Sequence, residues 1–345
     1  MKILFVGDLN EYGRSFQRYR TLIRLGHNIT AFSVAPVPRR PGIEKTPFFE
    51  RLFWKLKLPF DMTSVNEKIK EAAKKENYDI IWIEKGNTIK PSTLRFIKFR
   101  LPSAKLISLS EDDMYAPHNH TFYYKWGLRY YDIVFTTKVY NLEELKKIGA
   151  QKTKLFLDAY DETLHKPLSL SKEDRSEFGC DVGFIGTFEE DRAQKILYLA
   201  QNGIKVTVWG NGWSDWVGKH ENLIVKNQPL YGDDFVKAIN ATKINLCFLR
   251  KMNRDEVTSR SVEIPACGGF MLGERTKRHS DFFEEDKEAV FFDSVDELYE
   301  KVKRYLSDEA ARKQIAEAGR KKCFKSGYSM KIQLDKMIKI IIAQF

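Results

Sequence analysis

The sequence predicts an α/β protein with two parallel-sheet domains. The chain has 345 residues, which exceeds the size of one ordinary hydrophobic core, so about two domains are expected. Short apolar runs rich in β-branched residues alternate along the chain with amphipathic stretches of helical length. This alternation is typical of parallel strands covered by helices, and no repeat of solenoid length replaces it.

The first domain is predicted over residues 1–160. Six apolar runs of strand length are expected to form its sheet, at residues 2–9, 28–34, 79–86, 105–113, 132–138 and 153–160. Helices are expected between most of these strands, for example over residues 15–25 and 65–75. A late amphipathic helix over residues 328–345 is expected to pack back on this domain.

The second domain is predicted over residues 180–327. Residues 161–179, which precede it, carry turn and charge signals without a sustained period and are expected to form a linker. The strands of the second domain are expected at residues 180–188, 205–213, 222–228, 244–249, 269–274 and 289–294. Its helices include residues 191–201, 233–240 and 295–306.

The composition is typical of a globular protein from a reducing compartment. Hydrophobic residues make up 43% of the chain and charged residues 30%. The four cysteines are far apart and form no C-x-x-C pair, which argues against a zinc ribbon or a disulfide framework. Asp8 interrupts the first apolar run before a signal peptide could form, and the apolar tail is too short to span a bilayer. We therefore expect a cytoplasmic protein.

The residues that follow each strand are the candidates for ligand binding, because open α/β sheets bind ligands beyond the carboxyl ends of their strands. In the second domain these are Gly186 and Thr187 after the first strand, and Gly210 and Asn211 after the second. A further loop around Tyr231 is a candidate for contacts with a nucleotide base.

The fourth strand of the second domain is followed by a polar loop and a short helix. Asp255, Thr258 and Ser259 are capping candidates for this helix. Pro265 limits the helix to about two turns, and Gly268 supplies a C-terminal stop. The unpaired amides of the first turn would face the crevice, so an anionic ligand is expected there.

Glu263 on this helix would repel a phosphate, and the conflict points to a ligand with two parts. Phosphates would bind the helix amides and basic residues, while the carboxylate would hold a sugar diol such as that of ribose. The candidate basic residues are Arg192, Lys195 and Arg260. A surface ion pair is the more common role for each arginine alone, but their placement after successive strands favours ligand contact.

Two blocks of the sequence carry a resemblance to a known family. Residues 258–306 resemble the C-terminal block of the CgeB-like, spore-maturation-type glycosyltransferases, and residues 181–199 resemble the arginine-bearing start of the family's donor domain. The N-terminal domain is similar only in architecture. The resemblance implies the GT-B fold, in which two Rossmann-like domains face a central cleft. It also implies transfer of a sugar, with retention, from a nucleotide-diphosphate-sugar linked to UDP or GDP, without a metal or another cofactor.

In the wider retaining group two acidic residues are separated by seven positions. The second contacts the ribose and the first lies near the transferred sugar. Asp255 and Glu263 have this spacing, and the neighbouring Glu256 is the alternative to Asp255. The resemblance thus implies Asp255, Glu263, Arg192 and Lys195 as catalytic residues, and His118 joins the candidate catalytic set from its own polar loop. Arg192 and Lys195 are closer together than the basic pair of typical members, so Arg260 is the candidate substitute for one of them. The first turn of the short helix, with Thr258, Ser259, Arg260 and Ser261, would complete the donor site.

The acceptor is expected on the crevice side of the first domain. Gly13, Lys85, Asp112 and Asp113 are the candidates there, and His118 would belong to a hydrogen-bonding or acid/base loop rather than to a zinc site. No D-x-D motif follows a strand, so no metal is expected. A glycan, a lipid-linked molecule and a protein all remain open as the acceptor.

A net charge of +11 favours an anionic partner, although a solvated lysine-rich face explains it equally well. Residues 39–60 mix aromatic and aliphatic with basic side chains, as an interfacial helix would. One interpretation is contact with an anionic membrane surface at its inner face, and the other is a core helix followed by a basic loop. No nucleic-acid motif is present, so no nucleic-acid partner is expected.

Two other functions fit the same predicted scaffold. One is a sugar-nucleotide epimerase, which would turn over the donor without an acceptor. The other is a non-catalytic protein that binds a nucleotide or a nucleic acid, because a fold can persist after its chemistry is lost.

Overall fold

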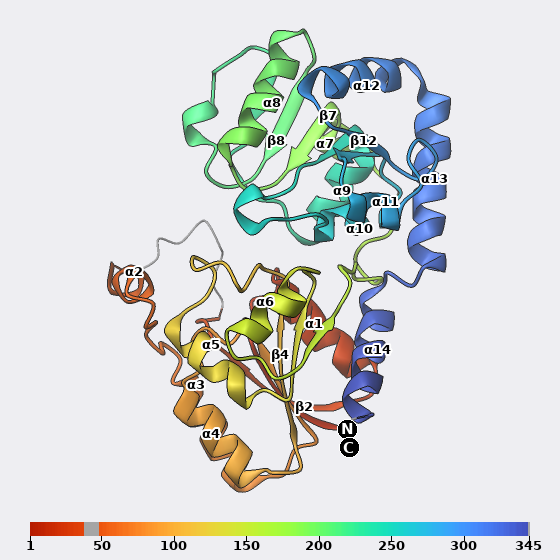
Figure 1. Cartoon of the computed structure of the whole chain (residues 1–345). Coiled ribbons are helices and arrows are strands. Elements are labelled where there is room, and N and C mark those ends of the chain that lie inside the picture. Colours follow the sequence, from red (N-terminus) through yellow and green to blue (C-terminus); the bar gives the residue numbers. More distant parts are fainter. Residues whose placement is uncertain (38–47, 344–345) are drawn as a thin grey trace. The chain divides into compact units, whose positions relative to one another are not determined.

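The computed structural model describes residues 1–37 and 48–343, and the chain separates into two compact units (Figure 1). Unit 1 comprises Met1–Leu157 together with Met330–Phe345, and unit 2 comprises Asp158–Ser329. Part of the proposed interfacial segment, residues 39–47, lies outside the described residues, as do the last two residues of the chain.

Unit 1 contains a six-stranded parallel sheet in the order β2-β1-β3-β4-β5-β6. Its strands are β1 (Lys2–Gly7), β2 (Asn28–Ser33), β3 (Ile80–Glu84), β4 (Lys105–Ser110), β5 (Ile133–Thr136) and β6 (Thr153–Leu155). Each strand lies within an apolar run that the sequence indicates. Each strand ends before its predicted run does, so the last residues of each run lie in the loop that follows the strand.

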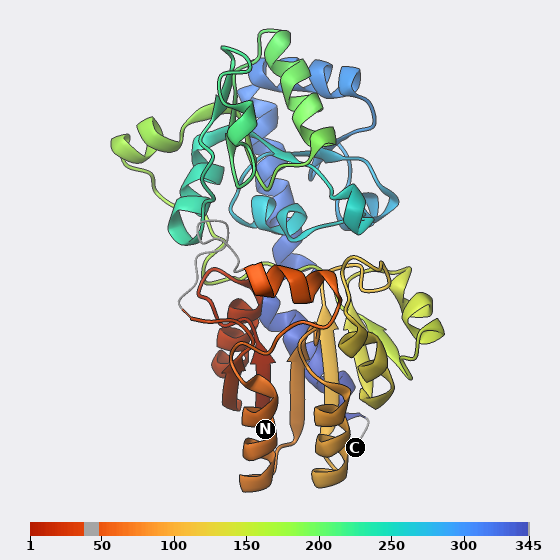
Figure 2. The ribbon, with the colours of Figure 1, turned by 90° about the vertical axis from the view of Figure 1, so that its left-hand side faces the viewer.

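Helices cover both faces of this sheet (Figure 2). The helices of unit 1 are α1 (Arg14–Arg24), α2 (Phe48–Lys55), α3 (Val65–Lys75), α4 (Pro91–Arg100), α5 (Phe122–Gly127), α6 (Asn141–Lys147) and α14 (Met330–Ile342), of which α2 lies away from the sheet (Figure 1). Leu4 and Val6 of β1 belong to a core formed with α3, α4 and α5. Phe5, between them, points to the other face and packs on Tyr19 of α1, with ring centroids 5.8 Å apart. The alternation of side chains along a strand thus buries β1 on both sides.

Unit 2 repeats this architecture with the strand order β12-β11-β10-β7-β8-β9, again entirely parallel. Its strands are β7 (Cys180–Ile185), β8 (Val206–Trp209), β9 (Leu223–Val225), β10 (Thr242–Cys247), β11 (Met271–Glu274) and β12 (Val290–Phe292). Its helices are α7 (Lys172–Phe178), α8 (Glu190–Gln201), α9 (Gly232–Ala241), α10 (Ser259–Ala266), α11 (Lys277–Phe282), α12 (Val295–Ser307) and α13 (Glu309–Lys325). The predicted fold class, two Rossmann-like parallel sheets with flanking helices, is confirmed.

The segment expected to be a linker contains a helix and belongs to unit 2. α7 begins at Ser171, whose hydroxyl accepts the backbone N–H of Asp174 at 3.0 Å, while the Asp174 carboxylate accepts the N–H of Ser171 at 3.1 Å. This reciprocal capping supports a helix that is too short to show a hydrophobic period. Asp174 also pairs with Lys237 of α9 at 2.9 Å, which ties α7 to the body of the unit.

Both sheets contain a point where the strand order reverses. In unit 1 the reversal lies between β1 and β3, and in unit 2 it lies between β7 and β10. Because crossover connections are right-handed, the helices that follow such a pair of strands turn to opposite faces of the sheet. Their loops separate and leave a crevice at the carboxyl ends, where ligands of this class of fold bind.

The end of β8 approaches the end of β7 so closely that only glycine fits there. Gly210 has a φ of +155°, and a Cβ at this position would lie 1.9 Å from the carbonyl oxygen of Gly186. The same carbonyl accepts a hydrogen bond from Trp213 Nε1 at 2.9 Å. Gly210 therefore holds the loops after β7 and β8 side by side.

We expect Gly210→Ala to lower the free energy of unfolding by on the order of 2–4 kcal/mol, because backbone strain and a backbone clash act together. Chemical denaturation followed by circular dichroism measures this loss. Gly203→Ala is the matched control, since Gly203 also has a positive φ, +81°, but open space around its Cβ position. Equal losses in the two variants would contradict the close approach.

Candidate functional site

In unit 2, the loops that the sequence singles out as donor-binding meet at the carboxyl edge of the sheet. The backbone N–H of Phe188, in the loop after β7, donates to the carbonyl of Asn211, in the loop after β8, at 2.9 Å. Arg260 reaches the same edge from α10, and its Nε donates to the carbonyl of Ile185 at 3.5 Å. Tyr231, immediately before α9, contacts the Asn211 side chain. Burial raises the pKa of the Tyr231 hydroxyl, so it stays protonated as a hydrogen-bond donor at neutral pH.

The first turn of α10 is fixed by a buried chain of hydrogen bonds. The hydroxyl of Ser261 accepts the N–H of Thr258 at 3.1 Å and lies 2.7 Å from Nε2 of His279. Nδ1 of His279 lies 2.6 Å from the carbonyl oxygen of Glu274, so Nδ1 carries the proton and Nε2 accepts from Ser261. Ser261 is fully buried, and its hydroxyl is thereby committed to positioning the turn. Thr258 is the N-cap of α10 and Ser259 is its first residue, at the end of the helix where backbone amides lack intrahelical partners.

Glu263 lies beneath Arg260. The Glu263 side chain is 1% exposed and pairs with the Arg260 guanidinium, which is 35% exposed. Arg260 also lies over the ring of Phe235, 4.1 Å from its centroid. Arg260 is therefore partly exposed to solvent, and Glu263 lies buried behind it.

His165 is a member of this group that sequence reasoning did not identify. Its Nε2 lies 3.8 Å from Oε1 of Glu263, and its Nδ1 accepts the backbone N–H of Asp161 at 3.0 Å. An accepting Nδ1 leaves the proton of the neutral ring on Nε2, facing the carboxylate. His165 and Glu263 are separated by about a hundred positions in the chain, so no local pattern could have paired them.

Arg192 is held under the loop that follows β7. The residue is 4% exposed, and its guanidinium donates to the carbonyl of Thr187 at 3.1 Å and lies 3.7 Å from Glu189. Its Nε has no hydrogen-bond partner among the described residues. Burial lowers the pKa of Arg192 from its usual value, although nearby carboxylates oppose the effect. A buried donor without a partner is costly, and an anionic ligand could satisfy it.

Unit 2 contains a hollow of about 360 Å³ between the ends of β10 and β11 and the start of α8. Asp255 lines it, and its carboxylate accepts a hydrogen bond from the side-chain amide of Asn253 at 2.7 Å. Glu256, the alternative acid, does not line the hollow. Its carbonyl instead accepts the hydroxyl of Thr276 at 2.6 Å. The geometry therefore distinguishes two neighbours that the sequence leaves equivalent.

Lys195 enters the same hollow between two carboxylates. It pairs with Asp191 and donates to Glu274 at 2.8 Å. Burial alone would lower the pKa of Lys195, but these two carboxylates outweigh burial and raise it. Glu274, which the sequence analysis did not single out, also accepts the N–H of Leu249 at 2.8 Å. Its position directly at the end of β11 was the signal that could have identified it.

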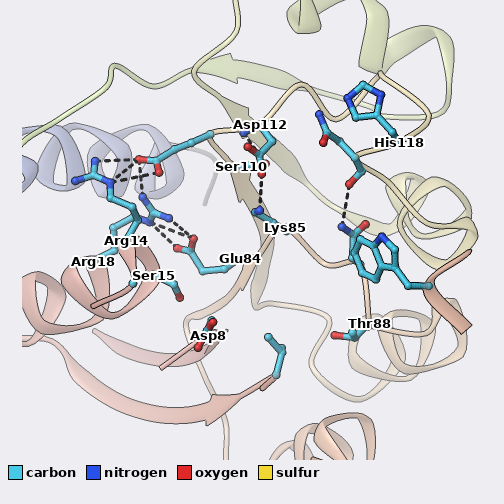
Figure 3. A pocket seen from close by; sticks show the side chains of 16 residues that line it. Asp8, Arg14, Ser15, Arg18, Glu84, Lys85, Thr88, Ser110, Asp112 and His118 are labelled. Carbon is cyan, nitrogen blue, oxygen red and sulfur yellow. Dashed lines mark hydrogen bonds and ion pairs between the residues drawn. The ribbon is translucent and has the colours of Figure 1, made fainter. Parts of the chain in front are cut away.

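In unit 1, a cavity of about 540 Å³ opens where the strand order reverses (Figure 3). Its lining includes the predicted acceptor-side residues Gly13, Lys85, Asp112 and His118. Lys85 and Asp112 form an ion pair, and although burial alone would raise the pKa of Asp112, Lys85 lowers it. Ser15 also lines the cavity, and its buried hydroxyl has no partner among the described residues.

Asp113 is the exception among these predicted residues. It is fully buried and accepts the side-chain amide of Asn141 at 2.8 Å and the N–H groups of Tyr115 and Ala116 at 3.2 Å. These bonds shape the turn that carries His118. The structure thus places Asp113 behind the cavity wall, as a positioning residue.

Four charged side chains at the back of the cavity form a network that sequence reasoning missed. Arg18 pairs with Glu84 at 2.6 Å and with Glu111 at 2.8 Å, and Arg14 pairs with Glu111 at 3.0 Å (Figure 3). Burial alone would raise the pKa of Glu111, but the two arginines outweigh burial and lower it to about 2. Loss of one partner from such a buried pair typically costs about 3–5 kcal/mol. The network therefore fixes the cavity wall.

No group of three or more metal-ligating side chains occurs among residues 1–37 and 48–343. Within the same ranges no helix is both long and apolar enough to cross a membrane.

The sequence and the fold of this chain are similar to those of known proteins. Residues 192–339 match the family model described as Glycosyl transferase-like. No curated protein matches the chain. Sucrose-phosphate synthase from Thermosynechococcus elongatus has a similar structure, with a TM-score of 0.72 and 11% identity over 100% of both chains.

Two further solved structures show the same likeness. The Anabaena protein HepE in complex with UDP and glucose has a TM-score of 0.67 and 13% identity, over 99% of this chain and 100% of that chain. A glycosyltransferase from Rickettsia africae has a TM-score of 0.65 and 14% identity, over 99% and 97% respectively. The chain therefore has the GT-B fold, and residues 192–339 are similar to the Glycosyl transferase-like family.

We expect His279 to make the protein less stable as the pH falls from about 6.5 to about 4. Burial lowers the pKa of His279 to about 4, whereas an unfolded histidine titrates near 6.5. Between these values the unfolded chain binds a proton that the folded chain does not, so unfolding becomes more favourable, by on the order of 3 kcal/mol in total. Urea denaturation at a series of pH values measures the effect. His279→Gln should remove this part of the pH dependence, and an unchanged profile in that variant would refute the assignment.

Proposed function

We propose that this chain, with its GT-B fold and glycosyl transferase-like C-terminal part, is a retaining glycosyltransferase. It would transfer a hexose from a nucleotide-diphosphate-sugar to an acceptor without a metal. The observation that carries the proposal is the grouping at the strand-order reversal of unit 2. There the start of α10 and the loops after β7 and β8 bring amides, a cation and an acid to one edge of the sheet.

The donor would bind this edge through its two chemically different parts. The diphosphate would contact the first-turn amides of α10 and the exposed guanidinium of Arg260. Arg192 would contribute its charge and its unpartnered Nε from beneath the loop after β7. When Arg260 turns to the diphosphate, the carboxylate of Glu263 becomes available for the ribose hydroxyls.

The main chemical task would be stabilisation of the leaving group. The bond between the anomeric carbon and the diphosphate oxygen breaks, and the departing diphosphate gains negative charge. Fixed cations and amides that meet this charge lower the barrier, because they need no reorganisation during the reaction. The acceptor oxygen would bond to the anomeric carbon on the face that the diphosphate leaves, and its proton would pass to the departing phosphate oxygen. Asp255 and Lys195 in the adjacent hollow would contact the transferred sugar.

The acceptor would bind the cavity of unit 1. Lys85, Asp112 and the hydroxyl of Ser15 offer hydrogen-bonding groups to an acceptor hydroxyl, and His118 lies at the lining of the same cavity as a candidate acid or base. We place the enzyme in the cytoplasm, peripheral to the inner face of a membrane.

The competing functions differ in what they do to the donor. An epimerase would convert a nucleotide-sugar in the absence of any acceptor, and a binding protein would retain it unchanged. The protein is incubated with a nucleotide-sugar that it binds, with and without an acceptor, and the sugar is then analysed by chromatography. The result distinguishes a transferase from an epimerase and from a binding protein. Turnover that requires an acceptor is the result expected of a transferase.

Glu263→Gln is expected to weaken the binding of a diphosphonucleoside by about 10- to 150-fold, because it removes charge-assisted hydrogen bonds to the ribose. UDP is the first ligand to test by titration calorimetry, since the similar Anabaena structure contains UDP, and GDP, dTDP and CMP follow. Glu317→Gln, in an exposed ion pair with Lys321, is the matched control. Equal dissociation constants for both variants would rule out a ribose contact by Glu263.

Asp255→Asn is expected to lower kcat by about 100- to 1,000-fold with little change in donor affinity, because its charge would act on the sugar in the transition state. Glu256→Gln should leave kcat close to that of the wild type, since Glu256 does not line the hollow. Steady-state kinetics with the donor found by calorimetry gives both values. The reverse order of effects would assign the role to Glu256.

A further inference from the structure

Unit 1 exposes several large apolar side chains beside its cavity. They belong to residues of α2 and the segment after it, together with two residues of α5, and we call them the apolar shelf: Leu52, Phe53, Trp54, Leu56, Phe60, Phe122 and Trp126. Phe60 is 61% exposed, Leu56 54% and Trp126 48%. Single exposed apolar residues are normal on a protein surface, but seven large ones in two adjoining segments indicate an interaction site.

Ring contacts lie within each part of the shelf, and one backbone hydrogen bond joins the two parts. The rings of Phe53 and Phe60 lie 6.1 Å apart, and those of Phe122 and Trp126 are stacked at 5.3 Å. The backbone N–H of Phe122 donates to the carbonyl of Lys57 at 3.0 Å, which fixes the start of α5 against the segment after α2. The aromatic side chains are therefore held at the surface by the backbone rather than left on a separate loop.

The charged side chains within the two segments that carry the shelf are all basic. Residues 51–60 and 122–130 contain no aspartate or glutamate, and they carry five basic residues: Arg51, Lys55, Lys57, Lys125 and Arg129. All of these except Lys57 are exposed, and Lys57 donates to the carbonyl of Pro117 at 2.7 Å. Aromatic side chains with long basic side chains at their edge suit the interface of an anionic bilayer, where rings enter the head-group region and lysines meet phosphates.

The shelf also reaches the cavity. Trp54 lines the cavity together with Asn87, Thr88 and His118, so the edge of the shelf is part of the cavity wall. The charges within the cavity are paired with one another, as in Arg18 with Glu84 and Lys85 with Asp112. The cavity thus offers polar groups, whereas the shelf offers apolar surface and excess positive charge.

We infer that the apolar shelf docks on an anionic lipid bilayer and holds the rim of the cavity at the membrane surface. The inference deepens the proposed peripheral location by naming the residues and the lipid chemistry. It rests on the proposed function only for the use of the cavity by an acceptor. Aromatic insertion supplies the apolar part of the binding free energy, and the basic residues supply a part that salt screens.

Sedimentation with vesicles tests the docking. The full-length wild type is expected to bind vesicles of equimolar phosphatidylcholine and phosphatidylglycerol, to bind pure phosphatidylcholine at least about tenfold more weakly, and to lose affinity as salt rises. Phe60→Glu and Trp126→Glu should each lower binding to the mixed vesicles at least about tenfold, the loss expected when one buried aromatic ring is replaced by a charge.

Phe324→Glu is the matched control. Phe324 lies on α13 of unit 2 and is 69% exposed, so the same substitution there changes charge and exposed area equally without touching the shelf. Its vesicle binding should equal that of the wild type. Absence of wild-type binding to the anionic vesicles, or equal losses from Phe60→Glu and Phe324→Glu, would overturn the inference.

Two further measurements separate this inference from the alternatives. Light scattering over a range of concentrations would reveal a dimer, and a dimer abolished by Phe60→Glu would assign the shelf to a second copy of the chain and overturn membrane docking. Calorimetry with UDP and without vesicles reports the donor site alone. Phe60 and Trp126 do not line the cavity, so both variants should bind UDP as the wild type does. If the wild type binds vesicles but not the nucleotide, the proposed function is wrong and the docking stands. If it binds the nucleotide but not the vesicles, the docking is wrong and the proposed function stands.

Discussion

The constraint on which both candidate sites depend is the reversal of strand order in each sheet. A parallel strand must be followed by a crossover, and the crossover is right-handed. Where β7 lies next to β10, and where β1 lies next to β3, the following helices turn to opposite faces and their loops cannot close over the strand ends. The polar residues after these strands then surround an open crevice. The close approach at Gly210 keeps the crevice of unit 2 in shape, because it fixes the loop after β8 against the loop after β7.

Buried charge is used in the same way in the two units. Glu263 is paired with Arg260, and Glu84 is paired with Arg18, so each of these two buried carboxylates has a guanidinium partner. An unpaired charge in these positions would cost several kcal/mol, roughly as much as a single domain can lose and still remain folded. The two pairs differ in exposure, since the Arg260 side chain is one-third exposed whereas Arg18 is buried. The proposed donor site uses this exposure of Arg260, while the pair in unit 1 serves the cavity wall.

Much of the fold could be predicted because strand and helix periods are local properties of the chain. Runs of six to nine residues in the sequence overlap all of the strands that the structure describes, and the predicted helix over residues 65–75 coincides with α3. α7 was taken for part of a linker because its first turn is stabilised by side-chain capping rather than by an apolar period. The roles of individual residues within the sites could be predicted less well from the sequence. Ser261 and Asp113 were placed among ligand-binding residues, but their hydrogen bonds to His279 and Asn141 lie across the fold and cannot be read from spacing.

The sequence by itself determined the two parallel sheets and the positions of the loops that follow their strands, because a hydrophobic period and its interruptions are written in consecutive residues. Only the tertiary structure decided which side chains in those loops are free to meet a ligand. It brought His165 to Glu263 and separated Asp255 from Glu256. It also left Phe53 and Trp54 of α2, and Phe122 and Trp126 of α5, exposed. These outcomes depend on partners that are distant in sequence, since burial and pairing are settled by packing in three dimensions.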